Sequence, residues 1–226
     1  MKLYKYIGLD SCADDFSIKK NRIIDIIKEK KIYLSTYCQL NDPFEGTFRS
    51  DKTIYKDKGG NIVINDNKPV DSNSSDRILC LTEDCESILM WAHYANSFKG
   101  ICLEFDINEP PKIEKVKYVK DFGDNFSFDP LVKSIEWEYE KEYRYISSTS
   151  DTYVTFDELG VELTKVIFGV KVNSDFLKDV VKELGGSSKI GLSYLCHEDG
   201  CKVRVKNYAA ITSNNFIHSL PFFNLE

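Results

Sequence analysis

An acidic stretch at residues 133–147, KSIEWEYEKEYRYIS, carries the densest set of chemically active side chains in the sequence. Its charged residues alternate with aromatic and apolar ones: Glu136, Glu138, Glu140, Glu142 and Arg144. Along a strand, residues two apart face the same side at about 7 Å, and carboxylates crowded in a cleft raise one another's pKa. We therefore expect Glu140, Glu142 and Arg144 to project into a cleft and form part of a functional site. The alternative is a solvated edge strand whose charges prevent aggregation.

A second group lies within residues 88–105, ILMWAHYANSFKGICLEF. The chain has only two tryptophans and three histidines, yet Trp91 and His93 stand two apart here, with Tyr94 beside them. On a helix, His93 would point about 200° away from Trp91 at 100° per residue. We expect Trp91 to fill the core and His93 with Tyr94 to line a cleft, and we keep all three as candidate ligand contacts. The alternative is that this helix and the acidic stretch form a protein-binding surface.

The segment LNDPFEG at residues 40–46 follows a predicted strand. Its proline fixes one backbone angle, and its asparagine and glycine suit a tight turn. The simplest interpretation is a rigid turn. Because loops held by a scaffold often carry ligand-binding groups, Asn41, Asp42 and Glu45 are also candidate contacts presented at a strand end.

Seven cysteines are present, an odd number, and no export signal accompanies them. Cys80 with Cys85, and Cys196 with Cys201 next to His197, are spaced at the loose limit of zinc pairs. We expect reduced thiols that serve packing, and neither a disulfide framework nor a metal site is assigned, although metal binding by these pairs stays open. The sequence contains neither a P-loop nor a glycine fingerprint after a strand. It therefore gives no support to a nucleotide-binding fold of the Rossmann type.

Short strands and helices must position these groups. Hydrophobic patterning predicts strands at residues 3–9, 31–36, 78–84, 100–106, 163–172, 191–196 and 201–208, the fifth of them central. The strand at 100–106 alternates and is expected to be half-buried, with Glu104 away from its aliphatic face.

Helices are predicted within residues 17–31, 85–97 and 174–186, with Ser17 and Ser174 as N-caps and Gly185 as the last stop. The middle helix would bury a stripe of Ile88, Trp91 and Ala95. In the acidic stretch we favour a helical turn at 133–139 followed by a strand through 142–147.

The chain is therefore expected to be one α+β domain over residues 1–226, with mixed or antiparallel sheets of about seven or eight strands and three or four helices. Residues 51–76, rich in Gly, Asn, Asp and Ser, suggest a flexible hairpin or lid insertion. Apolar residues at 42% suffice for a core, while a net charge of −6 and a pI near 5.3 argue against non-specific nucleic-acid binding. Neither a signal peptide nor a membrane span is indicated, so a cytoplasmic location is expected; the oligomeric state stays open.

Several uncommon short sequence motifs occur in a fixed order over residues 3–172: YKY, IYLS, LNDPFEG, CLTED, LMWAHYANSFKGICLEFD, VKY, WEYEKEYR and VIFGVKV. This series resembles the bacterial family known only as domain of unknown function 2971. The chain has Phe98 where members commonly carry a second histidine or polar residue before the glycine. The resemblance implies no activity by itself.

The order strand, helix, strand, invading loop and late glutamate-bearing strand also resembles the ADP-ribosyltransferase layout. That resemblance implies a split β-sandwich and a nucleotide-processing enzyme with NAD as substrate, no prosthetic group, and a setting in bacterial defence or toxin systems. The matching places are Lys5 or Tyr6 in the first strand, Ser35 in the second, and Glu140 or Glu142 in the late strand. The first strand lacks the Arg or His of that superfamily, and His93 is our candidate for the missing donor.

The chemistry would pass through an oxocarbenium-like state when the bond between nicotinamide and ribose breaks. Glu142 would stabilise that charge through the ribose 2′-hydroxyl, and Tyr94 or Tyr143 would stack on the nicotinamide or a base. Two alternatives stay open. One is a metal-dependent hydrolase or nuclease that uses Asp42, Glu45, His93 and Glu140 with Mg or Mn. The other is a non-catalytic protein-binding module.

Overall fold

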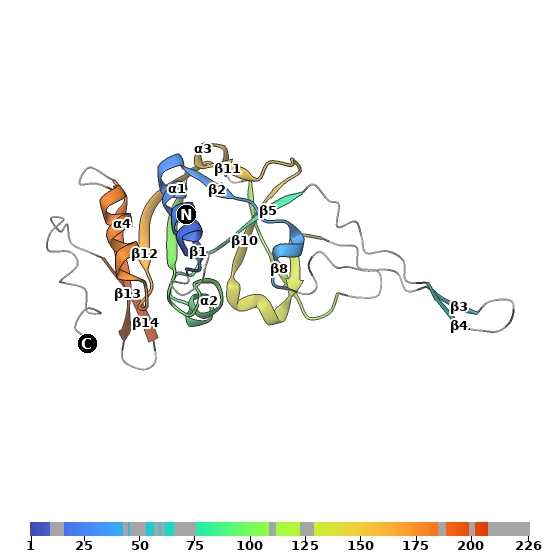
Figure 1. Ribbon diagram of the computed structural model, residues 1–226. Helices are drawn as coiled ribbons and strands as arrows, with labels where there is room; N and C mark the ends of the chain where they lie inside the picture. The colour runs from blue at the N-terminus through green and yellow to red at the C-terminus, as the bar shows by residue number, and fades with distance from the viewer. Residues whose placement is uncertain are drawn as a thin grey trace.

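The structure, a computed structural model, has an α+β architecture built on an eight-stranded mixed sheet (Figure 1). It describes residues 1–9, 16–42, 45, 53–56, 59, 62–65, 76–108, 112–122, 129–184, 189–198 and 202–207. From edge to edge the strands are β14 (Lys202–Asn207), β13 (Gly191–Glu198), β12 (Val161–Phe168), β6 (Ile101–Ile107), β1 (Lys2–Ile7), β5 (Arg77–Thr82), β10 (Glu142–Ser147) and β7 (Ile113–Lys115). Strands β12 and β13 run parallel, and the other neighbours are antiparallel. The predicted α+β class is confirmed.

Three small sheets and the helices complete the described part of the chain. The small sheets pair β2 (Lys31–Tyr33) with β11 (Tyr153–Thr155), β3 (Thr53–Lys56) with β4 (Ile62–Asn65), and β8 (Lys117–Val119) with β9 (Val132–Ser134). The helices are α1 (Phe16–Glu29), α2 (Ile88–Tyr94), α3 (Phe156–Leu159) and α4 (Ser174–Leu184), with 3-10 helices η1 (Tyr37–Gln39) and η2 (Ile135–Glu140). Among the described helices, none combines the length and the apolar character that a membrane crossing requires.

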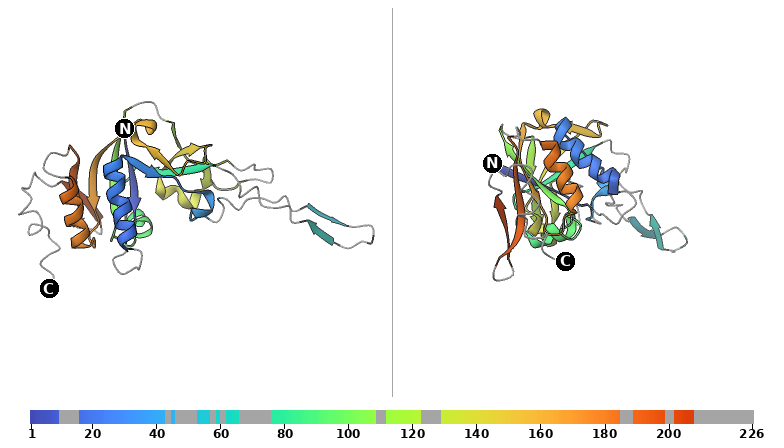
Figure 2. Two further views of the ribbon diagram at one scale, coloured as in Figure 1. Left: turned by 45° about the horizontal axis from the view of Figure 1, so that its top comes forward. Right: turned by 60° about the vertical axis from the view of Figure 1, so that its left-hand side comes forward.

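Helices cover both faces of the large sheet. Figure 2 shows α1 and α4 side by side on one face, and their apolar side chains form a core with Leu103 of β6. The neighbouring Cys102 belongs to a second core with Trp91 of α2. Because adjacent strand residues face opposite sides, α2 lies on the other face. The prediction that this strand is half-buried is therefore wrong: all five residues from 101 to 105 are buried.

Several predicted boundaries shift in the structure. Helix α1 begins at Phe16, so Ser17 lies within its first turn. Helix α4 is capped by Asn173, whose Oδ1 accepts from the backbone N–H groups of Asp175 and Phe176 at 2.9 and 3.0 Å. Ile88 of α2 is exposed, so it is not part of the buried stripe.

Other predicted segments differ from the structure in length or position, or lie partly outside the residues that the structure describes. The strand expected at 31–36 is shorter and joins β11 outside the main sheet. The strand at 163–172 lies inside the sheet, third from one edge. Strands β3 and β4 form an antiparallel hairpin within the segment 51–76; most of that segment, and Gly185, lie outside the described residues.

The large sheet opens between β1 and β5. These strands pair at one position, Tyr4 with Thr82, whereas β1 pairs with β6 along its whole length. Further along β5, Ser35 forms a bridge to Ile78. The Lys5 ammonium spans the opening and donates to the Cys80 carbonyl at 3.1 Å. This opening gives side chains from several segments, distant in the sequence, access to one space.

The acidic stretch folds as expected, with a helical turn before a strand. Helix η2 ends at Glu140, the following residue Lys141 has a left-handed backbone at φ 45°, and β10 begins directly after it. The turn breaks the alternation that a continuous strand would have. As a result Glu136 and Glu138 are exposed, while Glu140 and Glu142 are both buried.

Replacing Lys141 by valine is expected to lower the free energy of unfolding by about 1–2 kcal/mol relative to Lys141→Gly, because a β-branched side chain clashes in the left-handed region. Both variants lose the ion pair from Lys141 to Asp84 at 2.9 Å, so the comparison isolates the backbone. Urea unfolding of the two proteins measures the difference. Equal stabilities would contradict the left-handed turn.

Candidate active site in the opening of the sheet

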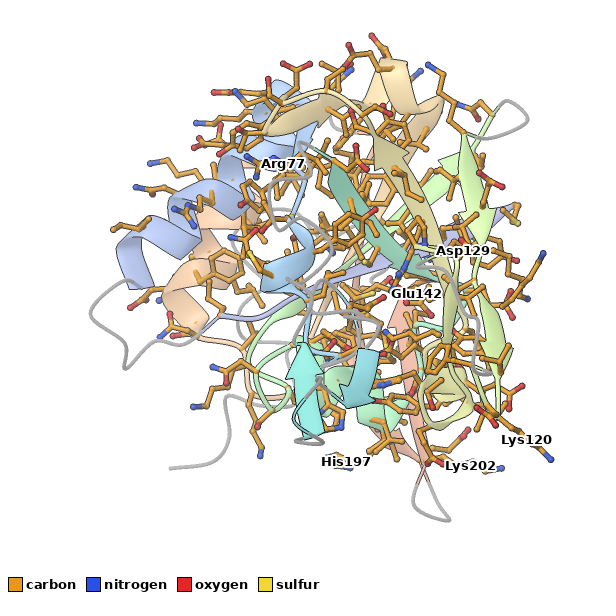
Figure 3. All side chains as sticks on the ribbon, turned by 90° about the vertical axis from the view of Figure 1, so that its right-hand side faces the viewer. Arg77, Lys120, Asp129, Glu142, His197 and Lys202 are labelled. Carbon is orange, nitrogen blue, oxygen red and sulfur yellow. The ribbon has the colours of Figure 1, made fainter. Side chains whose placement is uncertain are left out.

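A pocket of about 230 Å³ occupies the opening between β1 and β5. Its walls come from both strands, the segment after β2, α2, β9, η2 and β10. Most of the candidate residues from the sequence line it: Tyr6, Ser35, Asn41, Glu45, Tyr94, Glu140, Glu142 and Arg144. Glu142 is buried, and Figure 3 labels it near the centre of the view.

Buried cations hold the two glutamates of the acidic stretch. Lys133 donates to Glu140 at 2.5 Å and to Glu142 at 3.2 Å. Arg144 binds Glu142 through two hydrogen bonds of 2.8 and 2.9 Å, and it donates to the Pro130 carbonyl at 2.6 Å. The guanidinium also forms an ion pair with Glu45. Three carboxylates and two cations thus share one buried cluster.

The carboxyl groups of this cluster differ in acidity. Burial acts to raise the pKa of Glu142, but Arg144 and Lys133 outweigh it and lower the value to about 2. Burial raises the pKa of Glu140, and the nearby charge of Glu142 adds to the effect, while Lys133 offsets part of it. Glu142 is therefore held ionised, whereas Glu140 keeps its proton to a higher pH than an ordinary glutamate.

Glu45 behaves like Glu140. Burial raises its pKa to about 7, against the opposing charges of Arg144 and Lys133. Its Oε2 has no hydrogen-bond partner among the residues that the structure describes. A buried carboxyl oxygen without a partner is costly, so a bound ligand or water would lower the free energy of this site.

Replacing Glu45 by glutamine is expected to change how stability depends on pH. Because the pKa of Glu45 is raised from 4.5 to about 7 on folding, its contribution to stability is complete below pH 4.5 and is lost as pH rises through 7. Between pH 4.5 and 7.5 the wild type should lose about 3 kcal/mol more than Glu45→Gln. Urea unfolding at both pH values measures this, and parallel pH profiles would contradict a protonated Glu45.

A hydrogen-bond chain leads from the turn to Glu140. The Asn41 amide donates to the Tyr94 hydroxyl at 2.6 Å, and this hydroxyl donates to Glu140. Burial raises the pKa of Tyr94, which keeps its hydroxyl protonated and able to donate. Thr82 donates to the backbone carbonyl of Glu140 at 2.6 Å and so fixes the end of η2.

Three of the candidate residues do not line the pocket. Trp91 is 0% exposed, donates to the Cys85 carbonyl at 2.8 Å and packs edge-on against Tyr6, so it belongs to the core. His93 is exposed, and its ring lies 6.3 Å from that of Tyr139. Asp42 is buried next to the pocket without forming its wall. The structure therefore places Tyr94, but not His93, beside the glutamates.

Lys133 is the functional residue that the sequence reasoning missed. It is the first residue of the acidic stretch, and it was not among the candidate residues selected from the sequence. Lys141 instead pairs with Asp84 at the surface. The sequence feature that points to Lys133 is its apolar surroundings, seven residues before Glu140. Only the fold of β9, η2 and β10 brings Lys133 and Glu140 together.

The proposed metal ligands do not converge in the part of the chain that the structure describes, which holds no group of three His, Cys, Asp or Glu side chains suited to a metal ion. Cys80, Cys85 and Cys196 are free thiols, and Cys201 lies outside the described residues. Figure 3 shows His197 at the lower edge of the molecule, away from Glu142.

Comparison with known proteins leaves the function to be argued from this site. No family model, no curated protein and no solved structure matches the chain.

Proposed function

We propose that this protein cleaves the bond between nicotinamide and ribose in NAD or a related nucleotide, and passes the ADP-ribosyl group to water or to an acceptor hydroxyl. One observation carries the proposal: two carboxyl groups with opposite pKa shifts, Glu142 and Glu140, line the same pocket. Pairs of titratable groups whose environments separate their pKa values are typical of acid–base sites.

Glu142 is suited to stabilise positive charge. Its pKa of about 2 keeps it ionised at every working pH. When the C1′–N bond breaks, the electron pair leaves with nicotinamide, which departs neutral, and positive charge develops on the ribose. A fixed carboxylate next to that ring lowers the energy of the charged state, because it needs no rearrangement as the charge forms.

Glu140 is suited to act as the general base. Water, or an acceptor hydroxyl, adds to C1′ and must lose a proton, and Glu140 receives it. A raised pKa makes Glu140 a stronger base than an ordinary glutamate. Lys133 and Tyr94 hold the carboxylate in place, and the Tyr94 ring offers a face for nicotinamide.

The two alternative functions, a metal-dependent hydrolase and a protein-binding module, fit the geometry of the site less well. A metal-dependent hydrolase would need His93 to join Glu45 and Glu140, but His93 does not line the pocket. A protein-binding module gains little from polar groups that converge in a recess instead of spreading over a surface.

Incubation of the purified protein with NAD tests the proposal, with free nicotinamide and protein mass as readouts. We expect nicotinamide release, or an added ADP-ribose mass, that disappears in Glu142→Gln and persists in the presence of EDTA. Release that EDTA abolishes would favour the metal-dependent alternative. No release and no added mass from the folded wild type would overturn the proposal.

A further inference from the structure

A second cavity of about 630 Å³ adjoins the pocket. It lies between α1 and the strands β1 and β2, on the side of the opening away from the glutamates. The two cavities share four wall residues: Lys5, Tyr6, Ser35 and Gln39. The pocket alone is smaller than typical small-molecule sites, which span roughly 300–1,000 Å³, so a ligand longer than one sugar and one ring must extend beyond it.

Two tyrosines form an aromatic wall in this cavity. Tyr33 and Tyr153 are 37% and 46% exposed. Their ring centroids lie 5.8 Å apart at an interplanar angle of 76°. The Tyr33 hydroxyl is fixed by a 2.9 Å hydrogen bond to Gln39, one of the shared wall residues. Exposed aromatic rings stack on nucleobases; here Tyr33 is anchored, and the Lys31 ammonium lies 5.2 Å from the centre of the Tyr153 ring.

Charged groups suited to phosphate and ribose surround the same space. Arg22 of α1 is exposed, and it forms no ion pair with any residue that the structure describes. Lys5 lies at the junction of the two cavities. Arginine and lysine bind phosphate oxygens, and carboxylates accept hydrogen bonds from ribose hydroxyls. Asp25 and Glu29 supply such carboxylates on the same helix.

We propose that the second cavity binds a nucleoside diphosphate, with its base against Tyr33 and Tyr153 and its phosphates between Arg22 and Lys5. The inference rests on the proposed function, since it makes this cavity the site of the ADP half of the dinucleotide whose other half lies beside Glu142. A mononucleotide without the diphosphate would then fill only part of the combined site.

Binding of ADP, measured by calorimetry, tests the inference separately from catalysis. ADP lacks the nicotinamide riboside half, so its binding reports the second cavity alone. We expect Arg22→Ala to weaken ADP binding about tenfold, the effect of losing one charge-assisted contact. Lys28→Ala is the matched control: it removes a basic residue of the same helix that pairs with Glu183 at 2.9 Å and does not line the cavity.

Glu140→Gln separates the two proposals. We expect it to bind ADP within about twofold of the wild type, a change of less than 0.5 kcal/mol, while it loses nicotinamide release. Absent ADP binding, or equal binding by the wild type and Arg22→Ala, would overturn the inference even if nicotinamide is released. ADP binding that depends on Arg22 without any nicotinamide release would support the second cavity and reject NAD cleavage.

Discussion

Replacing Arg144 by methionine will lower the free energy of unfolding by about 3–5 kcal/mol, because it leaves buried carboxylates without their cation. Arg144 is 1% exposed and contacts Glu142, Glu45 and the Pro130 carbonyl at once. Methionine fills much of the volume but compensates none of the charge. Urea unfolding at neutral pH measures the loss.

The double variant Arg144→Met with Glu142→Gln is the control for charge. Since it removes the cation and its main carboxylate together, it should regain a substantial part of the stability that Arg144→Met loses. A single variant that loses less than about 1 kcal/mol, the range of an exposed pair, would show that the cluster is solvated. Additive losses in the double variant would show that the two side chains are not coupled.

Replacing Glu140 by glutamine should lower the rate of nicotinamide release by about 10²–10⁴-fold, the usual range for removal of a general base. The pH dependence should change with it. Because burial raises the pKa of Glu140, the wild-type rate should increase as pH rises through that raised value and Glu140 loses its proton. In Glu140→Gln this increase should be absent.

Glu138→Gln is the matched control, because Glu138 belongs to the same 3-10 helix but is exposed. Its rate and pH profile should match those of the wild type. If Glu140→Gln keeps the wild-type rate, Glu140 is not the base, and Glu45 becomes the remaining carboxyl with a raised pKa in the pocket.

The local pattern of the sequence was enough to predict much of the fold. Hydrophobic patterning predicted β5, β6, β12, β13 and β14, and the acidic stretch divided into a helical turn and a strand as expected. The burial of β6 on both faces was not predictable in this way, because it depends on α2 packing opposite α1 and α4. The N-cap of α4 shifted by one residue, since the side chain of Asn173 competes with that of Ser174.

The pocket residues, like the strands, could be predicted only in part from the local sequence. Chemical type and position were sufficient to select Asn41, Tyr94, Glu140, Glu142 and Arg144, which the fold brings together. The orientation of α2 about its own axis keeps His93 out of the pocket. Helical geometry predicts that His93 points away from Trp91, but it does not predict which neighbour of Trp91 faces the pocket. The single pairing between β1 and β5, which creates the space, has no signature in either strand.

The crystal structure of the Glu140→Gln variant with NAD tests the central claim most directly, because a slowed variant retains the uncleaved nucleotide. We predict that the nicotinamide riboside half lies in the pocket, with a ribose hydroxyl within hydrogen-bond distance of Glu142 and the nicotinamide against Tyr94. NAD bound elsewhere on the protein, or a pocket without nucleotide at saturating NAD, would contradict the claim.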